Sequence, residues 1–139
     1  MQIKRKSTAV WNGSGKDGKG RITSQSGVLN DTQYGFNSRF ADGIGTNPEE
    51  LIAAAHSGCF SMKLAFNLQA AGITADEIKT NAVVILEDGG INQIDLTTSV
   101  KAEGLTAEKL EELALDAKAN CPISKLFNAS ISLTINLVA

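Results

Sequence analysis

Apolar and polar positions alternate in the second half of the chain, as is typical of β-strands with one buried face. Residues 82–86 are continuously apolar, and residues 88–90 read Asp-Gly-Gly. Apolar side chains then take most alternate positions from Ile94 to Ala102. This order predicts a β-hairpin. The same alternation over residues 129–137 predicts a final strand.

A long helical segment begins where Asn47 can cap a helix and Pro48 suits its first position, and Gly72 provides the stop. Between residues 51 and 71 the only charged side chain is Lys63. A helix that is apolar on nearly all sides is normally buried, so we expect a buried helix here. Polar residues such as His56 interrupt the segment, which excludes a membrane span.

Thr106 predicts the cap of a second helix, whose apolar residues fall on one face. Residues 1–45 are rich in Gly, Ser, Thr and Asn and predict short strands joined by loops. The order of elements indicates an α+β protein with antiparallel sheet. We find no internal repeat and no dividing linker, so residues 1–139 are expected to form a single domain.

Composition narrows the function classes. The chain has 139 residues, 42% of them apolar, and 13 basic against 15 acidic residues give a net charge of -2. A chain with this charge balance has no positive electrostatic potential that would attract nucleic acid or an anionic membrane, so we expect neither as a partner. The basic start MQIKRK is not followed by the apolar run of a secretory signal, so we expect a cytoplasmic protein.

Two cysteines in a chain without an export signal indicate redox chemistry, because a disulfide in the cytosol is usually transient and catalytic. The pair and the single His56 do not fill a four-coordinate zinc site, so no metal is expected. The glycines at 13, 15 and 18 match a nucleotide-binding pattern, but a strand-like segment follows them where that pattern needs a helix.

Cys59 lies in the middle of the long helical segment, where a core cysteine would pack as a small hydrophobe. His56 is three residues earlier and could form a Cys-His couple, as in a hydrolase, or simply be a packed histidine. Cys121 precedes Pro122 and is placed at a helix N-terminus, where the dipole favours a thiolate. Helix-terminal reasoning alone therefore favours Cys121 as the attacking thiol.

Three segments carry a resemblance to a known family. They are YGFNSRF at residues 34–40, TNPEELIAAAHSGCFSM at 46–62 and NCPIS at 120–124. Together they resemble the osmotically inducible protein C (OsmC) family, whose sister group is the organic hydroperoxide resistance proteins. The resemblance extends over essentially the whole chain.

This resemblance implies an OsmC-like fold, with antiparallel sheets packed around long central helices in an intertwined homodimer. It implies a two-cysteine peroxidase without bound cofactor or metal, acting in oxidative or osmotic stress defence. Cys59 would be the peroxidatic thiol and Cys121 the resolving thiol, while Arg39 would stabilise the Cys59 thiolate and Glu49 would orient Arg39. The implied partners are an organic hydroperoxide and an external dithiol, such as dihydrolipoamide or a lipoyl protein.

Two questions stay open at the level of sequence. Glu49 precedes Cys59 by ten residues, about 15 Å along one helix, which leads us to expect chain folding or a second subunit at the site. The alternative function is a non-enzymatic dimeric stress protein that binds a hydrophobic ligand around Phe60, Met62 and Phe66.

Overall fold

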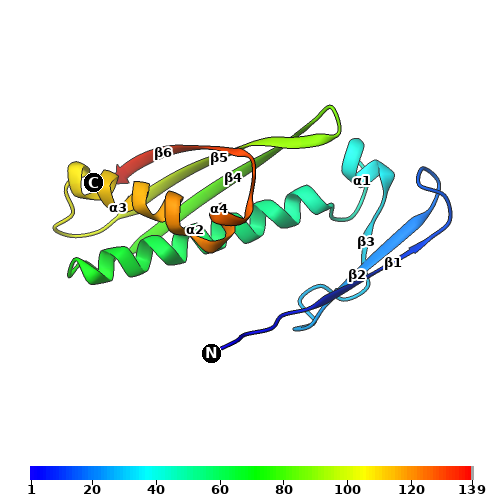
Figure 1. Ribbon diagram of the computed structural model, residues 1–139, viewed down its shortest axis with the longest axis horizontal. Coiled ribbons are helices and arrows are strands. Elements are labelled where there is room, and N and C mark those ends of the chain that lie inside the picture. The colour runs from blue at the N-terminus through cyan, green and yellow to red at the C-terminus, as the bar shows by residue number, and fades with distance from the viewer. Residues whose placement is uncertain (139) are drawn as a thin grey trace. The chain divides into compact units, whose positions relative to one another are not determined.

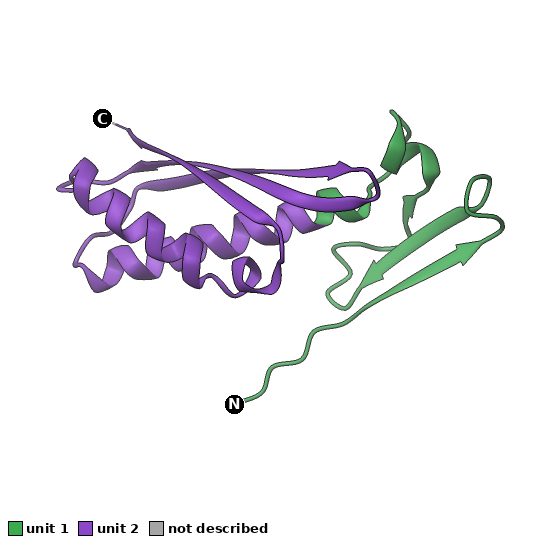
Figure 2. Cartoon of the chain, turned by 45° about the horizontal axis from the view of Figure 1, so that its top comes forward, with its two compact units in different colours: residues 1–51 green, residues 52–139 purple. Residues whose placement is uncertain are grey.

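The computed structural model describes residues 1–138, which divide after Leu51 into two compact units (Figure 2). Each unit is a continuous part of the chain and is described by itself below. The single domain expected over residues 1–139 stays a prediction, because a compact unit is not by that fact an independently folding one.

The first unit contains a three-stranded antiparallel sheet in the order β1-β2-β3, followed by a short helix α1. The elements are β1 (Ser7–Asn12), β2 (Lys19–Ser24), β3 (Thr32–Tyr34) and α1 (Phe36–Phe40). The strands agree with the prediction for residues 1–45, whereas α1 was missed. With five residues, α1 is too short to show a helical period.

Helix α2 (Pro48–Ala70) has the predicted bounds. Oδ1 of Asn47 accepts a hydrogen bond from the backbone N–H of Glu50 over 2.8 Å and caps the helix. The Glu50 carboxylate accepts a hydrogen bond from the Thr46 hydroxyl over 2.6 Å, and not from the backbone N–H at the start of the helix. Gly72, at a φ of 78°, follows the helix in the left-handed conformation that favours glycine.

The second unit contains most of α2 and a second sheet in the order β4-β5-β6. Its elements are β4 (Glu77–Glu87), β5 (Gly90–Lys101), α3 (Ala107–Asn120), α4 (Pro122–Leu126) and β6 (Ser130–Val138). The predicted hairpin is confirmed, with β4 and β5 antiparallel and Asp88 and Gly89 at positive φ in its turn. The predicted cap of α3 is also confirmed, since Thr106 accepts from the backbone N–H of Lys109.

The α+β class is confirmed, with one correction to the expected antiparallel pairing. Strand β6 runs parallel to β5. The reason is the connection, because α3 and α4 carry the chain back across the sheet before β6 begins, and such a helical crossover brings a strand in parallel.

Helices α2 and α3 lie along one face of the β4-β5-β6 sheet, and the core lies between them and the sheet (Figure 1). Asn67 of α2 donates from its side-chain amide to the carbonyl of Leu113 in α3 over 3.0 Å and ties the two helices together. The fully buried apolar residues of this core are Phe60, Leu64, Leu68, Ile94, Leu96, Val100, Leu110, Ala114 and Ala117.

The expectation that α2 is buried on nearly all sides is wrong for the described chain. Phe60 is fully buried, whereas Met62 and Phe66 are 64% and 59% exposed. Within the second unit the sheet, α3 and the α4 segment contact α2, and Met62 and Phe66 lie on a side of α2 that these elements do not cover. Among the described helices, none is long and apolar enough to cross a bilayer.

Two leucines of α3 provide a matched test of this core. Leu110 is fully buried and Leu115 is 48% exposed. We expect Leu110→Ala to lower the free energy of unfolding by about 3 kcal/mol, because it leaves a cavity, and Leu115→Ala by less than about 1 kcal/mol. Urea unfolding of both variants at one protein concentration checks this, and equal losses would contradict the packing.

Candidate functional site

The two cysteines of the chain meet, although they lie 62 positions apart in the sequence. The Cys121 thiol donates a hydrogen bond to Sγ of Cys59 over 2.7 Å. Both are free thiols, and this separation is longer than the roughly 2.05 Å of a disulfide bond. Cys121 is fully buried, whereas Cys59 is partly exposed. The pair is therefore reachable from solvent through Cys59.

Cys121 reaches this position because it is the single residue between two helices. Its backbone N–H bonds to the carbonyl of Ala117 over 2.9 Å and closes the last turn of α3. Pro122 then begins α4, at the helical position where a missing N–H costs nothing. Cys121 therefore lies at the N-terminus of α4, as the sequence predicted.

The surroundings of Cys59 oppose its ionisation. Burial raises the pKa of the Cys59 thiol above its ordinary value. The adjacent Cys121 raises this pKa further, mainly through the hydrogen bond between the two thiols and to a lesser extent because two thiolates in contact would repel each other. The backbone N–H of Ile123, in the first turn of α4, lowers the pKa in part. The α4 amide thus acts on Cys59, whereas the helix-terminal argument from sequence assigned that benefit to Cys121.

His56 does not pair with Cys59. Its Nε2 lies 2.7 Å from Oγ of Ser124, and its ring packs on that of Phe127 with centroids 5.5 Å apart. Both His56 and Ser124 are buried, and burial lowers the pKa of the His56 imidazole. The packed histidine is therefore the arrangement found, and Cys-His hydrolase geometry is not.

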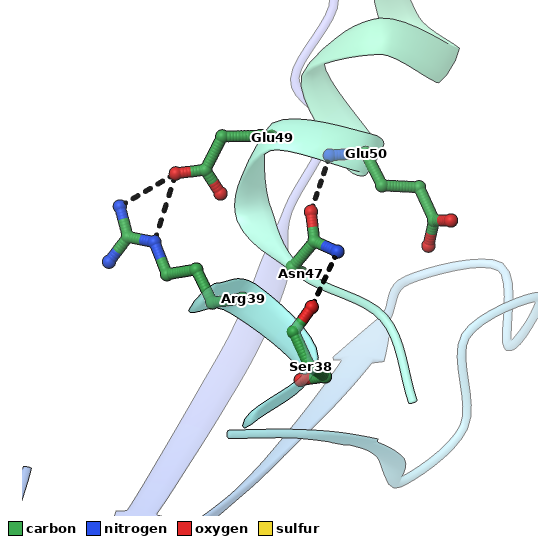
Figure 3. Close-up of polar contacts among 5 residues, drawn as sticks. All are labelled: Ser38, Arg39, Asn47, Glu49 and Glu50. Carbon is green, nitrogen blue, oxygen red and sulfur yellow. Dashed lines mark hydrogen bonds and ion pairs between the residues drawn. The ribbon is translucent and has the colours of Figure 1, made fainter. Parts of the chain in front are cut away.

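Arg39 and Glu49 form the charged contact of the first unit (Figure 3). Nη2 and Nε of Arg39 lie 2.8 and 2.9 Å from the same carboxylate oxygen of Glu49. Glu49 is buried, while the Arg39 side chain is 40% exposed and also lies over the Phe40 ring, 5.2 Å from its centroid. One edge of the guanidinium is thus fixed and its other edge points away from Glu49.

Local contacts place this ion pair at the junction of α1 and α2. The side-chain amide of Asn47 donates to the carbonyl of Ser38 over 2.9 Å, so the cap of α2 is tied to α1 (Figure 3). Gly45 lies in the loop between them at a φ of 113°, and a Cβ there would overlap the carbonyl oxygen of Gln33. Glycine is therefore required where this loop turns toward α2.

The predicted site residues thus fall into two pairs, each described within its own unit. Arg39 and Glu49 belong to residues 1–51, and Cys59 and Cys121 to residues 52–139. Over residues 1–138, no group of three or more His, Cys, Asp or Glu side chains could hold a metal ion.

Two contacts of the site were missed from sequence, namely Ser124 with His56 and the Ile123 amide with Cys59. A signal for the first was available. His56 lies three residues before Cys59, and Ser124 lies three residues after Cys121. A spacing of three residues places His56 and Cys59 on one helical face, and it does the same for Cys121 and Ser124.

Comparison with known proteins relates this geometry to a family. The family model described as OsmC-like protein matches residues 41–136. Peroxiredoxin OsmC of Escherichia coli (strain K12) is 45% identical over 141 aligned positions, which cover 99% of each chain. The chain belongs to the OsmC-like protein family. The resemblance seen in the sequence is thereby confirmed.

Solved structures agree with this family assignment. The organic hydroperoxide resistance protein OhrB of Bacillus subtilis is similar at a TM-score of 0.65 and 31% identity, covering 96% of this chain and 98% of that one. An OsmC-like protein from Mycoplasma pneumoniae gives a TM-score of 0.79 over 100% of both chains, but at 16% identity it bears on the fold alone. The predicted OsmC-like fold is confirmed, and the homodimer stays a prediction.

The lowered pKa of His56 predicts a pH dependence of stability. Below its ordinary value of 6.5 the unfolded chain binds a proton that the folded chain resists, so stability falls as pH falls. Below pH 6.5 we expect the free energy of unfolding of the wild type to fall by up to about 1.4 kcal/mol per pH unit. The free energy of unfolding of His56→Gln should lack this part of the pH dependence. Urea unfolding between pH 8 and 5 measures it cleanly, since the chain has one histidine. Parallel slopes would contradict it.

Proposed function

We propose that this protein is a thiol-dependent peroxidase that reduces organic hydroperoxides to alcohols, in defence against oxidative or osmotic stress. The observation that carries the proposal is the 2.7 Å approach of the Cys59 and Cys121 sulfurs as free thiols. The relatives support it by name, since one is a peroxiredoxin and another an organic hydroperoxide resistance protein.

The proposed reaction has three steps. The Cys59 thiolate attacks the terminal oxygen of the hydroperoxide, the O–O bond breaks, and the departing alkoxide takes a proton and leaves as alcohol. The sulfur of the resulting sulfenic acid is attacked by the Cys121 sulfur, the S–O bond breaks, and water leaves as the disulfide forms. An external dithiol then reduces the disulfide by exchange and becomes oxidised itself.

The exposure of the two cysteines supports this order. Cys59 is partly exposed and can meet a substrate, whereas Cys121 is fully buried beside it. A buried thiol is suited to react with its neighbour and not with a molecule from solvent. We therefore assign the peroxidatic role to Cys59 and the resolving role to Cys121.

Activation of Cys59 requires a cation, because burial and Cys121 raise its pKa. We propose Arg39 for this role and Glu49 as the carboxylate that orients it. A guanidinium stays charged, and its planar fork can meet a carboxylate on one edge and a thiolate on the other. The contact of Glu49 with a single edge of Arg39 supports this assignment.

The remaining partners follow from the same proposal. The electron donor is an external dithiol, such as dihydrolipoamide or a lipoyl protein, and no bound cofactor or metal takes part. We also propose a cytoplasmic homodimer, and the exposed Met62 and Phe66 on α2 support it, because large exposed apolar residues often mark protein interfaces.

The alternative, a hydrophobic-ligand binder, loses support from the fold. Phe60 is fully buried in the core, while Met62 and Phe66 are exposed on another side of α2. The three side chains therefore do not line one pocket as that alternative requires.

A steady-state assay with dihydrolipoamide tests the function. We expect faster turnover with cumene hydroperoxide than with hydrogen peroxide, and loss of activity in Cys59→Ser by at least about 10³-fold, because the attacking group is removed. Cys121→Ser should keep the first step and accumulate sulfenic acid at Cys59, detectable with a sulfenic-acid probe. Equal activity of wild type and Cys59→Ser would overturn the proposal, and labelling absent from Cys59 would reverse the two roles.

The role of Arg39 is tested through the pH dependence of Cys59 oxidation. We expect Arg39→Gln to move the rate profile to higher pH by about one unit or more, which is roughly a tenfold loss of rate near neutral pH. Glu49→Gln should give a smaller shift in the same direction. Arg21→Gln is the matched control, since Arg21 is an exposed arginine of β2. Identical profiles for Arg39→Gln and Arg21→Gln would exclude Arg39 from activation.

A further inference from the structure

Helix α2 contacts the start of α4, from its N-cap Cys121 to Ser124, through two side-chain pairs that lie about one turn apart. Cys59 meets Cys121 over 2.7 Å, and His56 meets Ser124 over 2.7 Å. The order of the pairs is reversed along the two helices, so the segments run antiparallel at this point. Two contacts at the same offset fix both the register and the rotation of α4 against α2.

Helix α4 needs such contacts in order to keep its place. It has five residues, and a helix that short is not stable on its own in water. His56 contacts it at two points, at Ser124 inside the helix and at Phe127, the residue that ends it. His56 therefore supplies two contacts to α4 and its end, and it does so one helical turn away from Cys59.

The His56–Ser124 pair is not a hydrolytic site. Both side chains are buried, and a Ser-His nucleophile needs a third group to orient the imidazole. Nδ1 of His56 is buried without a hydrogen-bond partner in the described part of the chain. The contact to Ser124 is thus the polar interaction that holds this ring.

We propose that His56 and Ser124 are positioning residues, whose hydrogen bond holds α4 on α2 so that Cys121 stays within reach of the Cys59 sulfenic acid. This inference rests on the proposed function and deepens it. Neither residue touches the reacting oxygen. Their effect is on the effective concentration of the Cys121 thiol at Cys59.

The proposal has a chemical consequence under excess hydroperoxide. A sulfenic acid at Cys59 either condenses with Cys121, with loss of water, or is oxidised by a second hydroperoxide molecule to sulfinic acid, with release of a second alcohol. Holding Cys121 close favours the disulfide. Loosening α4 leaves the sulfenic acid exposed for longer and increases the sulfinic product.

The experiment compares four substitutions in the full-length protein. Ser124→Ala removes the hydroxyl. Ser124→Thr and Ser124→Val add the same branch but differ in the hydroxyl, so their difference isolates the hydrogen bond from shape. Ser61→Ala is the matched control, because the Ser61 hydroxyl donates over 2.7 Å to Thr80 of β4 and anchors another side of α2.

Two readouts are taken for each variant. The first is the equilibrium constant of the Cys59–Cys121 disulfide against glutathione, which reports effective concentration and needs no peroxidase activity. The second is the fraction of sulfinic acid at Cys59 after cumene hydroperoxide, measured by mass spectrometry. We expect Ser124→Ala and Ser124→Val to lower the constant about three- to tenfold and to raise the sulfinic fraction, as loss of one hydrogen bond predicts.

The outcomes separate the two proposals. Values near wild type for Ser124→Thr and Ser61→Ala, with a loss in Ser124→Val, support positioning by the hydroxyl. Equal constants for Ser124→Thr and Ser124→Val, or an equal loss in Ser61→Ala, would overturn it. If hydroperoxide fails to oxidise Cys59 in the wild type, the proposed function fails, and the glutathione constants still decide the positioning role.

Discussion

The contact between Cys59 and Cys121 depends on which face of α2 is buried. Phe60, Leu64 and Leu68 recur every four residues and fix that face against the sheet and α3. His56 continues the same series toward the helix start, and Cys59 lies next to Phe60. Hydrophobic burial is non-directional, but the helical period turns it into a fixed orientation for the polar side chains.

Helix α3 contributes the other half of this arrangement by the same means. Leu110, Ala114 and Ala117 are fully buried, so the rotation of α3 is fixed by its apolar stripe. Cys121 caps that helix through the carbonyl of Ala117. The small side chains at 114 and 117 leave α3 close to its neighbours, and the register of α3 then determines where Cys121 and α4 begin.

Much of the fold could be predicted because its signals are local. Helix starts are predictable from Asn47, Pro48 and Thr106, because these residues suit the backbone hydrogen bonding at a helix N-terminus. The alternation of apolar and polar residues on β5 indicates a strand with one buried face. The parallel pairing of β6 was not predictable in this way, because its alternation is the same in either direction. The exposure of Met62 depends on how many layers cover α2, which no local pattern records.

The candidate site was predictable to a different extent. The residue types and motifs indicated Cys59, Cys121, Arg39 and Glu49 through the resemblance to a family, while spacing alone could not bring two cysteines 62 positions apart together. The contact of His56 with Ser124 spans 68 positions, and the matching three-residue offsets from the cysteines indicate it only once Cys59 and Cys121 are known to meet. Long-range contacts arise from the packing of helices that are each locally specified, so they follow from the fold and not from the pattern.

The burial that brings the thiols together also opposes their reactivity. Taking Cys59 out of water and placing Cys121 against it raises the pKa of Cys59, whereas the proposed reaction uses Cys59 as a thiolate. The Ile123 amide offsets a part of that cost without adding a charge. A full positive charge nearby would lower the pKa further, and a guanidinium is suited to this because it stays ionised beside an apolar surface.

The ion pair of the first unit has the properties that such a role requires. A free arginine loses considerable side-chain entropy when it is ordered, so a guanidinium already held by Glu49 has less to lose on meeting an anion. Glu49 is buried and accepts both contacts from Arg39 on one oxygen, so that Nε and Nη2 of the guanidinium are held at a single point. Because Glu49 takes up Nε and Nη2, the Nη1 side stays directed away from the carboxylate. A thiolate placed on that side would meet a cation whose orientation is set before the thiolate forms.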